Sequence, residues 1–188
     1  MLWGAHQGGL ELRTEGGETR LRATFPYGRE TVLSDGGRTG KARREKIAPR
    51  AFADRIERAE EIHLLAGHDY NRPLASTRAG NLTLTDTDQA LVIEARIDAG
   101  TSWARDFLSA HASGLVRGLS PGFRVPEGGE LVEDRGDAIL RTVMTAELFE
   151  ISAVTVPAYP EAQIEARSWQ PIAPEVRRAN LSYANRWR

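Results

Sequence analysis

The most strand-like part of the chain, residues 138–156, constrains the fold more than any other feature. Ala138–Met144 and Glu147–Val156 are rich in apolar and β-branched residues, and short runs of that composition are typical of buried strands. Pro157 and Pro160 follow, and we expect the folded domain to close near Ile164. The chain is therefore expected to be built mainly on β-sheet.

Further segments of the chain favour five more strands and two helices. One helix is expected at Ala51–Ala59, and another begins at Thr101 or Ser102 and ends near Ala112. Ser34–Glu45 carries glycines and many charges, which predicts a flexible loop. The additional strands alternate apolar and polar residues or are short apolar runs; they are Leu21–Phe25, Glu61–Ala66, Leu82–Leu84, Ala90–Ile97 and Leu115–Val125.

The order of these elements indicates the fold class. Strands cluster and helices are inserted between them, which favours an α+β fold, a mostly antiparallel β barrel with peripheral helices, over a doubly wound α/β sheet. The length of 188 residues fits one domain. We expect a loosely ordered N-terminus at residues 1–20, a folded domain at 21–166 and a basic tail at 167–188.

Composition excludes several classes of function. The net charge of −1 supplies no field that would attract nucleic acid or an anionic membrane. No apolar stretch approaches the roughly 18 residues of a membrane span, so we expect neither partner. The chain has no cysteine, which rules out disulfides, thiolate metal sites and a cysteine nucleophile.

Ser120 lies between two glycines in the run Gly118–Phe123, GLSPGF. Flanking glycines permit unusual backbone angles and the close approach of a substrate backbone, although a serine between glycines is also common in turns and bulges. The Gly-x-Ser-x-Gly spacing is that of the α/β-hydrolase nucleophile elbow, but residues 123–126 do not start a helix as that motif requires. Ser120 is therefore a candidate nucleophile that needs partners elsewhere in the chain.

A serine nucleophile needs a general base, and four histidines are candidates. His68 directly follows Gly67 at the end of a strand-like segment, where a rigid scaffold presents a base to an open site. His63 lies inside the same segment and stays an alternative. His111 is near a helix end, which suits a charge–dipole role, and His6 lies in the N-terminal segment. We expect His68 rather than His63 to be the base.

The third requirement is a carboxylate that orients the base. Asp69 is adjacent to His68, but neighbouring side chains of an extended chain point in opposite directions. Glu150 interrupts the apolar run Leu148–Val156, and a charge in a buried strand is costly unless it is paired. Alternation also allows a solvent-exposed sheet face that Glu150 shares with Ser152. Glu150 is the better candidate.

Metal and cofactor chemistry have little support in the sequence. His63 and His68 are five residues apart, with Asp69 next, and this spacing matches no zinc-binding pattern. The glycine loop that binds phosphate is also missing from the sequence. We therefore expect neither a metal site nor a cofactor.

Taken in order, these segments closely resemble the HK97-type prohead protease family of tailed phages and phage-derived particles. The resemblance covers about residues 21–166, and its combined pattern is far more specific than any single piece. It rests on five stretches: Glu45–Phe52 (EKIAPRAF), Leu64–Asp69 (LLAGHD), Arg72–Thr77 (RPLAST), Gly118–Phe123 (GLSPGF) and Leu148–Ala162 (LFEISAVTVPAYPEA).

The resemblance implies a serine endopeptidase that cleaves scaffold, or the scaffold-like N-terminal region of the major capsid protein, and also itself. It implies action inside assembling proheads in the bacterial host cytoplasm, a fold similar to that of the herpesvirus assembly proteases, and a homodimer by the same similarity. The family's histidine falls on His68, its serine on Ser120 and its third residue on Glu150. Gene-transfer particles encode such proteases too, and the short chain is compatible with either source.

Two departures from the family pattern concern stabilisation of the oxyanion. Pro121 has no amide N–H, so Gly122 or Phe123 would have to donate in its place. The herpesvirus enzymes use arginines just after the third residue, whereas Thr155–Ala158 contains none. These departures keep a second hypothesis open, in which the chain is a catalytically silent scaffolding component that docks on capsid protein.

Overall fold

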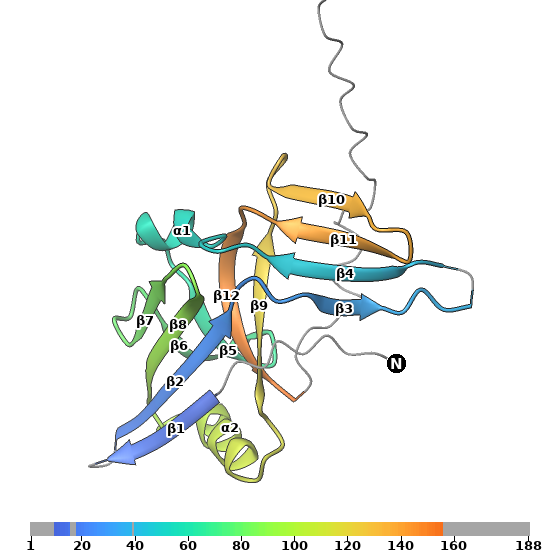
Figure 1. Ribbon diagram of the computed structural model, residues 1–188. Coiled ribbons are helices and arrows are strands. Elements are labelled where there is room, and N and C mark those ends of the chain that lie inside the picture. Colours follow the sequence, from blue (N-terminus) through green and yellow to red (C-terminus); the bar gives the residue numbers. More distant parts are fainter. Residues whose placement is uncertain (1–9, 16–17, 39, 156–188) are drawn as a thin grey trace, which may run out of the picture.

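The computed structural model describes residues 10–15, 18–38 and 40–155. Twelve strands and two helices make up this part of the chain (Figure 1). The helices are α1 (Ala53–Glu57) and α2 (Ser102–Ala112), and neither is long and apolar enough to cross a membrane. The strands are β1 (Leu10–Glu15), β2 (Glu18–Pro26), β3 (Thr31–Ser34), β4 (Ala42–Ile47), β5 (His63–Ala66), β6 (Asp69–Ser76), β7 (Leu82–Asp86), β8 (Ala90–Ile97), β9 (Gly118–Arg124), β10 (Glu130–Asp134), β11 (Ala138–Val143) and β12 (Glu147–Val154).

These strands form three four-stranded sheets. Their orders are β1-β2-β8-β7, β10-β11-β4-β3 and β6-β5-β12-β9, and the pairs are antiparallel except β4 with β11 and β5 with β12. In Figure 1, β12 and β9 run through the centre, with the β3–β4 sheet on the right and the β1–β2 sheet on the left. The expected mostly-β fold with few helices is confirmed. None of the sheets closes on itself within the described ranges, so the closed barrel is not confirmed.

The hydrophobic core draws buried side chains from all three sheets. Phe52, just before α1, is fully buried, and its ring centroid lies 5.5 Å from that of Phe123 on β9. This contact anchors the α1 region on the β6-β5-β12-β9 sheet. Other core members alternate along their strands, as expected for sheets with one buried face; they include Leu21, Ala23 and Phe25 of β2 and Leu91, Ile93 and Ala95 of β8.

Helix α2 begins where its capping residue predicts. The Thr101 hydroxyl accepts a hydrogen bond from the Ala104 amide at 3.3 Å, which satisfies one of the free amides of the first turn. Helix α1 is shorter than the expected 51–59. It is flanked by Arg50 and Ala59, whose φ angles of 57° and 52° are left-handed and interrupt a right-handed helix.

The predicted loop at Ser34–Glu45 is wrong in its second half, because β4 begins at Ala42. The charges that suggested a loop are paired inside the sheet. Glu45 is opposite Arg141 of β11 in the parallel register, and its carboxylate accepts from the Arg141 guanidinium at 2.5 Å. The Glu130 carboxylate accepts from Nε of the same guanidinium at 2.6 Å. Pairing offsets the cost of burying a charge in a strand. The alternation of apolar and polar residues along the sequence gives no sign of such a pair.

Part of the N-terminal segment that we expected to be loosely ordered is paired. Leu10–Glu15 forms β1, and β2 begins at Glu18 rather than Leu21. Leu12 is opposite Leu21 across the antiparallel pair, so apolar alternation continues into this segment. Residues 1–9 and the predicted basic tail at 167–188 lie outside the described residues.

A partly buried carboxyl group joins β7 to the end of β2. The Tyr27 hydroxyl donates to Asp86 Oδ1 at 2.7 Å, while Asp86 Oδ2 is buried without a hydrogen-bond partner. The pKa of Asp86 is raised above its ordinary value, mainly by burial. The hydrogen bond from Tyr27 and the positive charge of Arg50 act in the opposite direction and lower it. The carboxyl group is thus more easily protonated in the folded chain than in the unfolded chain.

We expect Asp86→Asn to flatten the acid limb of the stability profile. Because the folded-state pKa of Asp86 is raised, its contribution to stability is fully present below pH ~4, its unfolded value, and is lost as pH rises through the folded value. Asparagine keeps the acceptor for Tyr27 and carries no charge at any pH. Urea unfolding between pH 3 and 7 should show a smaller fall with rising pH in Asp86→Asn than in wild type. Asp106→Asn, at an exposed position of α2, is the control and should follow wild type.

Candidate active site

The predicted site residues gather on the β6-β5-β12-β9 sheet. Its core face presents Leu119 of β9 and Ile151 and Ala153 of β12 to the hydrophobic core. Residues between these in the sequence point to the opposite face, because side chains alternate along a strand. That opposite face, called the site face below, carries Ser120 and Gly122 of β9 and Glu150 and Ser152 of β12.

A β-bulge at Phe149 decides which face Glu150 takes. Leu148 is opposite Phe123 and Glu150 is opposite Gly122. Between these two pairs β12 advances by two residues while β9 advances by one, which defines a β-bulge. Leu148 lies in the core, and regular alternation would have turned Glu150 to the core as well. The extra residue shifts the alternation and puts Glu150 on the site face, where it is 5% exposed.

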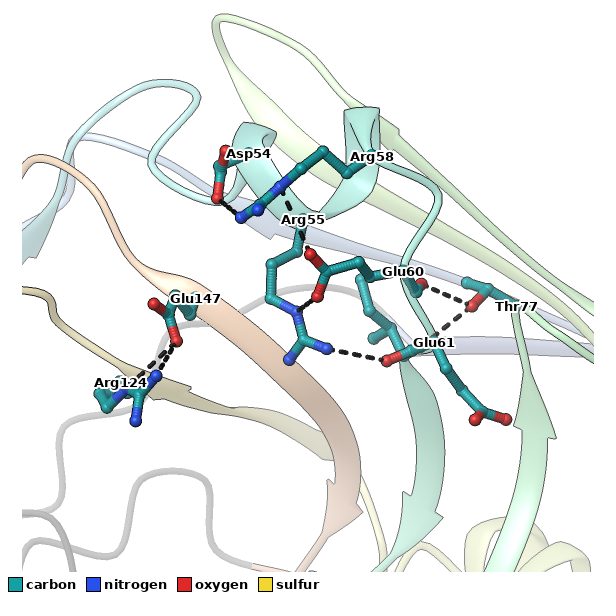
Figure 2. A network of polar contacts seen from close by, with 9 residues as sticks. Asp54, Arg55, Arg58, Glu60, Glu61, Thr77, Arg124 and Glu147 are labelled. Carbon is teal, nitrogen blue, oxygen red and sulfur yellow. Dashed lines mark hydrogen bonds and ion pairs between the residues drawn. The ribbon is translucent and has the colours of Figure 1, made fainter.

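Arg55 of α1 packs on the residue that forms this bulge. Its guanidinium carbon is 4.4 Å from the centroid of the Phe149 ring, within the range of a cation–π contact. Figure 2 shows how the same guanidinium is held between Glu60 and the Glu61 carbonyl, at 2.6 and 3.5 Å, beside β12. Arg124 of β9, paired with Glu147 at 2.5 Å, lies on the other side of β12 in that view. These contacts tie the bulged part of β12 to α1 and the start of β5.

His68 lies in the tight turn between β5 and β6. Gly67 and His68 are the two residues between the paired Ala66 and Asp69, and their φ angles are 68° and 62°. Positive φ at both central residues is the pattern of the type I′ turn that suits a two-residue hairpin. For a residue other than glycine this conformation is uncommon, and it is often found where structure serves a site. The Gly67 amide also donates to the Ala153 carbonyl at 3.0 Å, which docks the turn on β12.

The turn brings His68 to Glu150. His68 Nδ1 is 2.8 Å from Glu150 Oε1, although 82 residues separate them in sequence. The His68 side chain is 35% exposed and that of Glu150 is 6% exposed. A neutral imidazole whose Nδ1–H donates to the carboxylate leaves Nε2 free to accept a proton. This is the arrangement of a general base held by an orienting carboxylate.

Ser152 links the same two residues. Its hydroxyl accepts from the His68 backbone amide at 2.9 Å and donates to Glu150 Oε2 at 2.6 Å. Sequence reasoning mentioned Ser152 only as a neighbour that would share a face with Glu150. The Glu-x-Ser spacing, two residues apart on one strand, is the signal that could have found it.

Ser120 is directly opposite Ser152 in the antiparallel pair of β9 and β12. Side chains in this relation lie on one face with Cβ atoms about 4.5–5.5 Å apart. Ser120 is therefore next to the His68–Glu150 contact, and it is 3% exposed. Within the described ranges no hydrogen bond joins the Ser120 hydroxyl to the His68 ring. Such bonds are often long in ligand-free sites and tighten when substrate binds.

In the described residues, the other histidines and the neighbouring aspartate make no hydrogen bond to Glu150. His63 is opposite Glu150 in the parallel pair of β5 and β12, but its ring packs edge-on against Tyr70, with centroids 5.7 Å apart. His111, in the last turn of α2, places Nδ1 2.9 Å from the Val116 carbonyl. Asp69 accepts from the Asn71 amide at 2.9 Å. His6 lies outside the described residues. In the part of the chain that the structure describes, no three metal-ligating side chains gather.

The charge of Glu150 extends to one exposed aromatic residue. Burial, followed by the negative charge of Glu150, raises the pKa of Tyr70 above its ordinary value, and the positive charge of Arg55 opposes this. Tyr70 is 58% exposed on β6. The site face is thus bordered by an aromatic hydroxyl that lies within electrostatic reach of both Glu150 and Arg55.

Gly122 leaves the space that the Glu150 carboxylate fills. A Cβ added at Gly122 would lie 2.1 Å from Glu150 Oε1 and 2.8 Å from its carboxyl carbon, closer than any real contact. The backbone of Gly122 is not left-handed, so the requirement for glycine comes from the carboxylate and not from φ. The close approach of the two strands here therefore depends on the missing side chain.

We expect Gly122→Ala to expel the Glu150 carboxylate from its place beside His68. Overpacking of this kind should lower the free energy of unfolding by about 1–3 kcal/mol. Urea unfolding measures the loss, and the ¹⁵N shifts of the His68 imidazole report the broken contact. The same change in a Glu150→Ala background should cost much less stability, since the obstructing carboxylate is gone. An equal cost in both backgrounds would contradict the explanation.

Comparison with known proteins identifies the family of the chain. The family model for the caudovirus prohead serine protease matches residues 29–174, which include His68, Ser120 and Glu150. Neither a curated protein nor a solved structure matches the chain. The family match spans most of the 188 residues and supports the resemblance noted in the sequence over residues 21–166. The chain belongs to the family of caudovirus prohead serine proteases.

Proposed function

We propose that the chain is a serine endopeptidase in which Ser120 is the nucleophile, His68 the general base and Glu150 the orienting carboxylate. The observation that carries this proposal is the 2.8 Å contact between His68 Nδ1 and Glu150 Oε1, made next to a serine on the neighbouring strand. Membership of a serine protease family supports the reaction type. The three residues come from three separate segments of the chain, and the sheet brings them together.

Each residue has a defined part in the proposed reaction. The Ser120 hydroxyl attacks the scissile carbonyl while His68 Nε2 takes its proton, and His68 then returns that proton to the leaving amine. Glu150 holds the proton of His68 on Nδ1 and stabilises the imidazolium that forms. Water then releases the acyl group from Ser120 by the same steps. Pro121 has no N–H, so the oxyanion donors are expected to be the amides of Gly122 or Phe123.

The proposed substrate is scaffold or the scaffold-like N-terminal region of the major capsid protein, together with the chain itself. The family description names the prohead, and this supports the proposal that cleavage takes place inside assembling proheads in the host cytoplasm. Confinement in a shell would raise the local concentration of substrate, so a modest intrinsic affinity would suffice.

A fluorophosphonate probe tests the enzymatic proposal directly. The purified chain is treated with the probe and the labelled peptide is located by mass spectrometry, and co-expression with the capsid protein shows which bonds are cut. Labelling of Ser120 and defined cleavage of the capsid protein are expected. Absence of both, in the free chain and in assembled particles, would reject the protease and favour the catalytically silent scaffolding component.

We expect Glu150→Gln to reduce activity less completely than loss of the base or the nucleophile. Glutamine keeps the shape of the side chain but loses the charge that stabilises the imidazolium, and removal of an orienting group usually costs less than removal of the groups that react. Its rate of probe labelling should be about 10- to 100-fold above that of a His68 variant. A rate equal to wild type would remove Glu150 from the site. Glu147→Gln, on the same strand and paired with Arg124, is the matched control and should keep the wild-type rate.

A further inference from the structure

Ser152 closes a ring of hydrogen bonds around the proposed base. From the Ser152 hydroxyl, one bond goes to Glu150 Oε2 at 2.6 Å, and Glu150 Oε1 meets His68 Nδ1 at 2.8 Å. The backbone amide of His68 returns to the Ser152 hydroxyl at 2.9 Å. The imidazole of His68 is thus bonded to the Glu150 carboxylate, and the backbone of His68 is bonded to the Ser152 hydroxyl that holds the same carboxylate.

The direction of each bond in this ring follows from the donors available. The His68 amide can only donate, so the Ser152 oxygen accepts from it and uses its own proton for Glu150. Ser152 is 0% exposed, and a lost partner at this depth leaves a buried group unsatisfied. Oε2 is then occupied by Ser152, which leaves Oε1 for the Nδ1–H of His68. The ring therefore fixes the orientation of the carboxylate as well as the position of the imidazole.

The same bonds distinguish the two serines that are opposite each other on β9 and β12. The proton of Ser152 is already donated to Glu150, and its oxygen is engaged by the His68 amide. Ser120 has neither contact in the described part of the structure. Ser152 is thus held as a structural hydroxyl, which leaves Ser120 as the one suited to attack.

We propose that Ser152 is a positioning residue that acts through Glu150 and His68. This inference rests on the proposed serine protease function. Ser152 holds the left-handed His68 turn against β12 and, with its proton, holds Glu150 in the orientation that His68 needs. It makes no contact with substrate, so its removal affects the rate of the chemical step and leaves substrate binding nearly unchanged.

The test is Ser152→Ala, assayed by fluorophosphonate labelling of Ser120 in the full chain. A misplaced base lowers reactivity by about 10- to 100-fold, so the labelling rate at saturating probe should fall by that factor. The probe concentration that gives half-maximal rate should change less than about threefold, because binding is not altered. Hydrogen exchange of the His68 amide, followed by NMR, should become faster in this variant. Ser76→Ala is the matched control, because the Ser76 hydroxyl also accepts from a backbone amide, that of Ala79 at 3.1 Å, and should label at the wild-type rate.

A double-mutant cycle with Glu150→Ala separates positioning from a general structural role. If Ser152 acts through Glu150, Ser152→Ala should cost less than about threefold in the Glu150→Ala background. An equal cost in both backgrounds, or a wild-type rate in the single variant, overturns the inference. If the alanine variant does not fold, Ser152→Cys replaces it in the same cycle, because the thiol occupies the position of the hydroxyl with a weaker donor. Its labelling rate should fall by less than the factor expected for Ser152→Ala. Failure of the wild-type chain to label Ser120 rejects the protease proposal instead, so the two failures are distinct.

Discussion

Ser120→Ala is expected to abolish proteolysis and probe labelling, with a loss of at least about 1,000-fold. The alanine has no oxygen to attack the scissile carbonyl. Ser152, the serine opposite it on β12, is not free to replace it, because its hydroxyl donates its proton to Glu150. Cleavage of co-expressed capsid protein, followed by mass spectrometry, measures the effect. An unchanged cleavage rate would show that Ser120 is not the nucleophile.

The same variant should remain folded. Ser120 is 3% exposed, but the described structure gives its hydroxyl no side-chain hydrogen bond to lose. The free energy of unfolding should therefore stay within about 1 kcal/mol of wild type. Ser76→Ala, which removes a hydroxyl outside the site, is the control for handling and expression. Loss of both folding and activity would instead indicate a structural part for Ser120.

His68 variants are expected to match Ser120→Ala in severity, again at least about 1,000-fold. The imidazole is the group that takes and returns the proton. Among the described residues His68 alone of the histidines hydrogen-bonds to Glu150, at 2.8 Å, although His63 is opposite Glu150 across β5 and β12. Probe labelling at several concentrations measures the rate. A wild-type rate in His68→Ala would leave the site without its base and contradict the assignment.

The backbone of His68 requires a second substitution. Its φ of 62° is strained for alanine, so His68→Ala alters the turn as well as the chemistry. Asparagine tolerates the left-handed conformation and cannot act as a base, so His68→Asn should be equally inactive with a better preserved fold. His63→Ala is the control that removes the rival histidine, and it should retain labelling. Loss of activity in His63→Ala, with activity retained in the His68 variants, would show that His63 is the general base.

Local sequence patterns predicted the elements that carry the site. The apolar runs of β8, β11 and β12 and the cap of α2 follow from composition and periodicity, because burial on a regular strand or helix face selects for them. The strands that were missed have other reasons for pairing. β4 is charged and is stabilised by Arg141, and β3 and β10 are short segments that pair at the edges of the same sheet. β3 and β10 each pair with the strand that follows them in the sequence, but the sheet itself depends on the parallel pairing of β4 with β11, which are distant in the sequence.

The sequence alone determined which residue types were available for chemistry: Ser120 between glycines, His68 after Gly67, Glu150 in an apolar run, and no cysteine. It left the face of Glu150 open, because alternation assumes a regular strand. Tertiary structure decided that point through the bulge at Phe149. It also decided for His68 over His63 as the partner of Glu150, because the type I′ turn folds His68 back onto β12. Both outcomes depend on contacts between separate segments: β12 with β9 for the bulge, and His68 with Glu150, 82 residues away, for the turn. A pattern read along one chain does not contain such contacts.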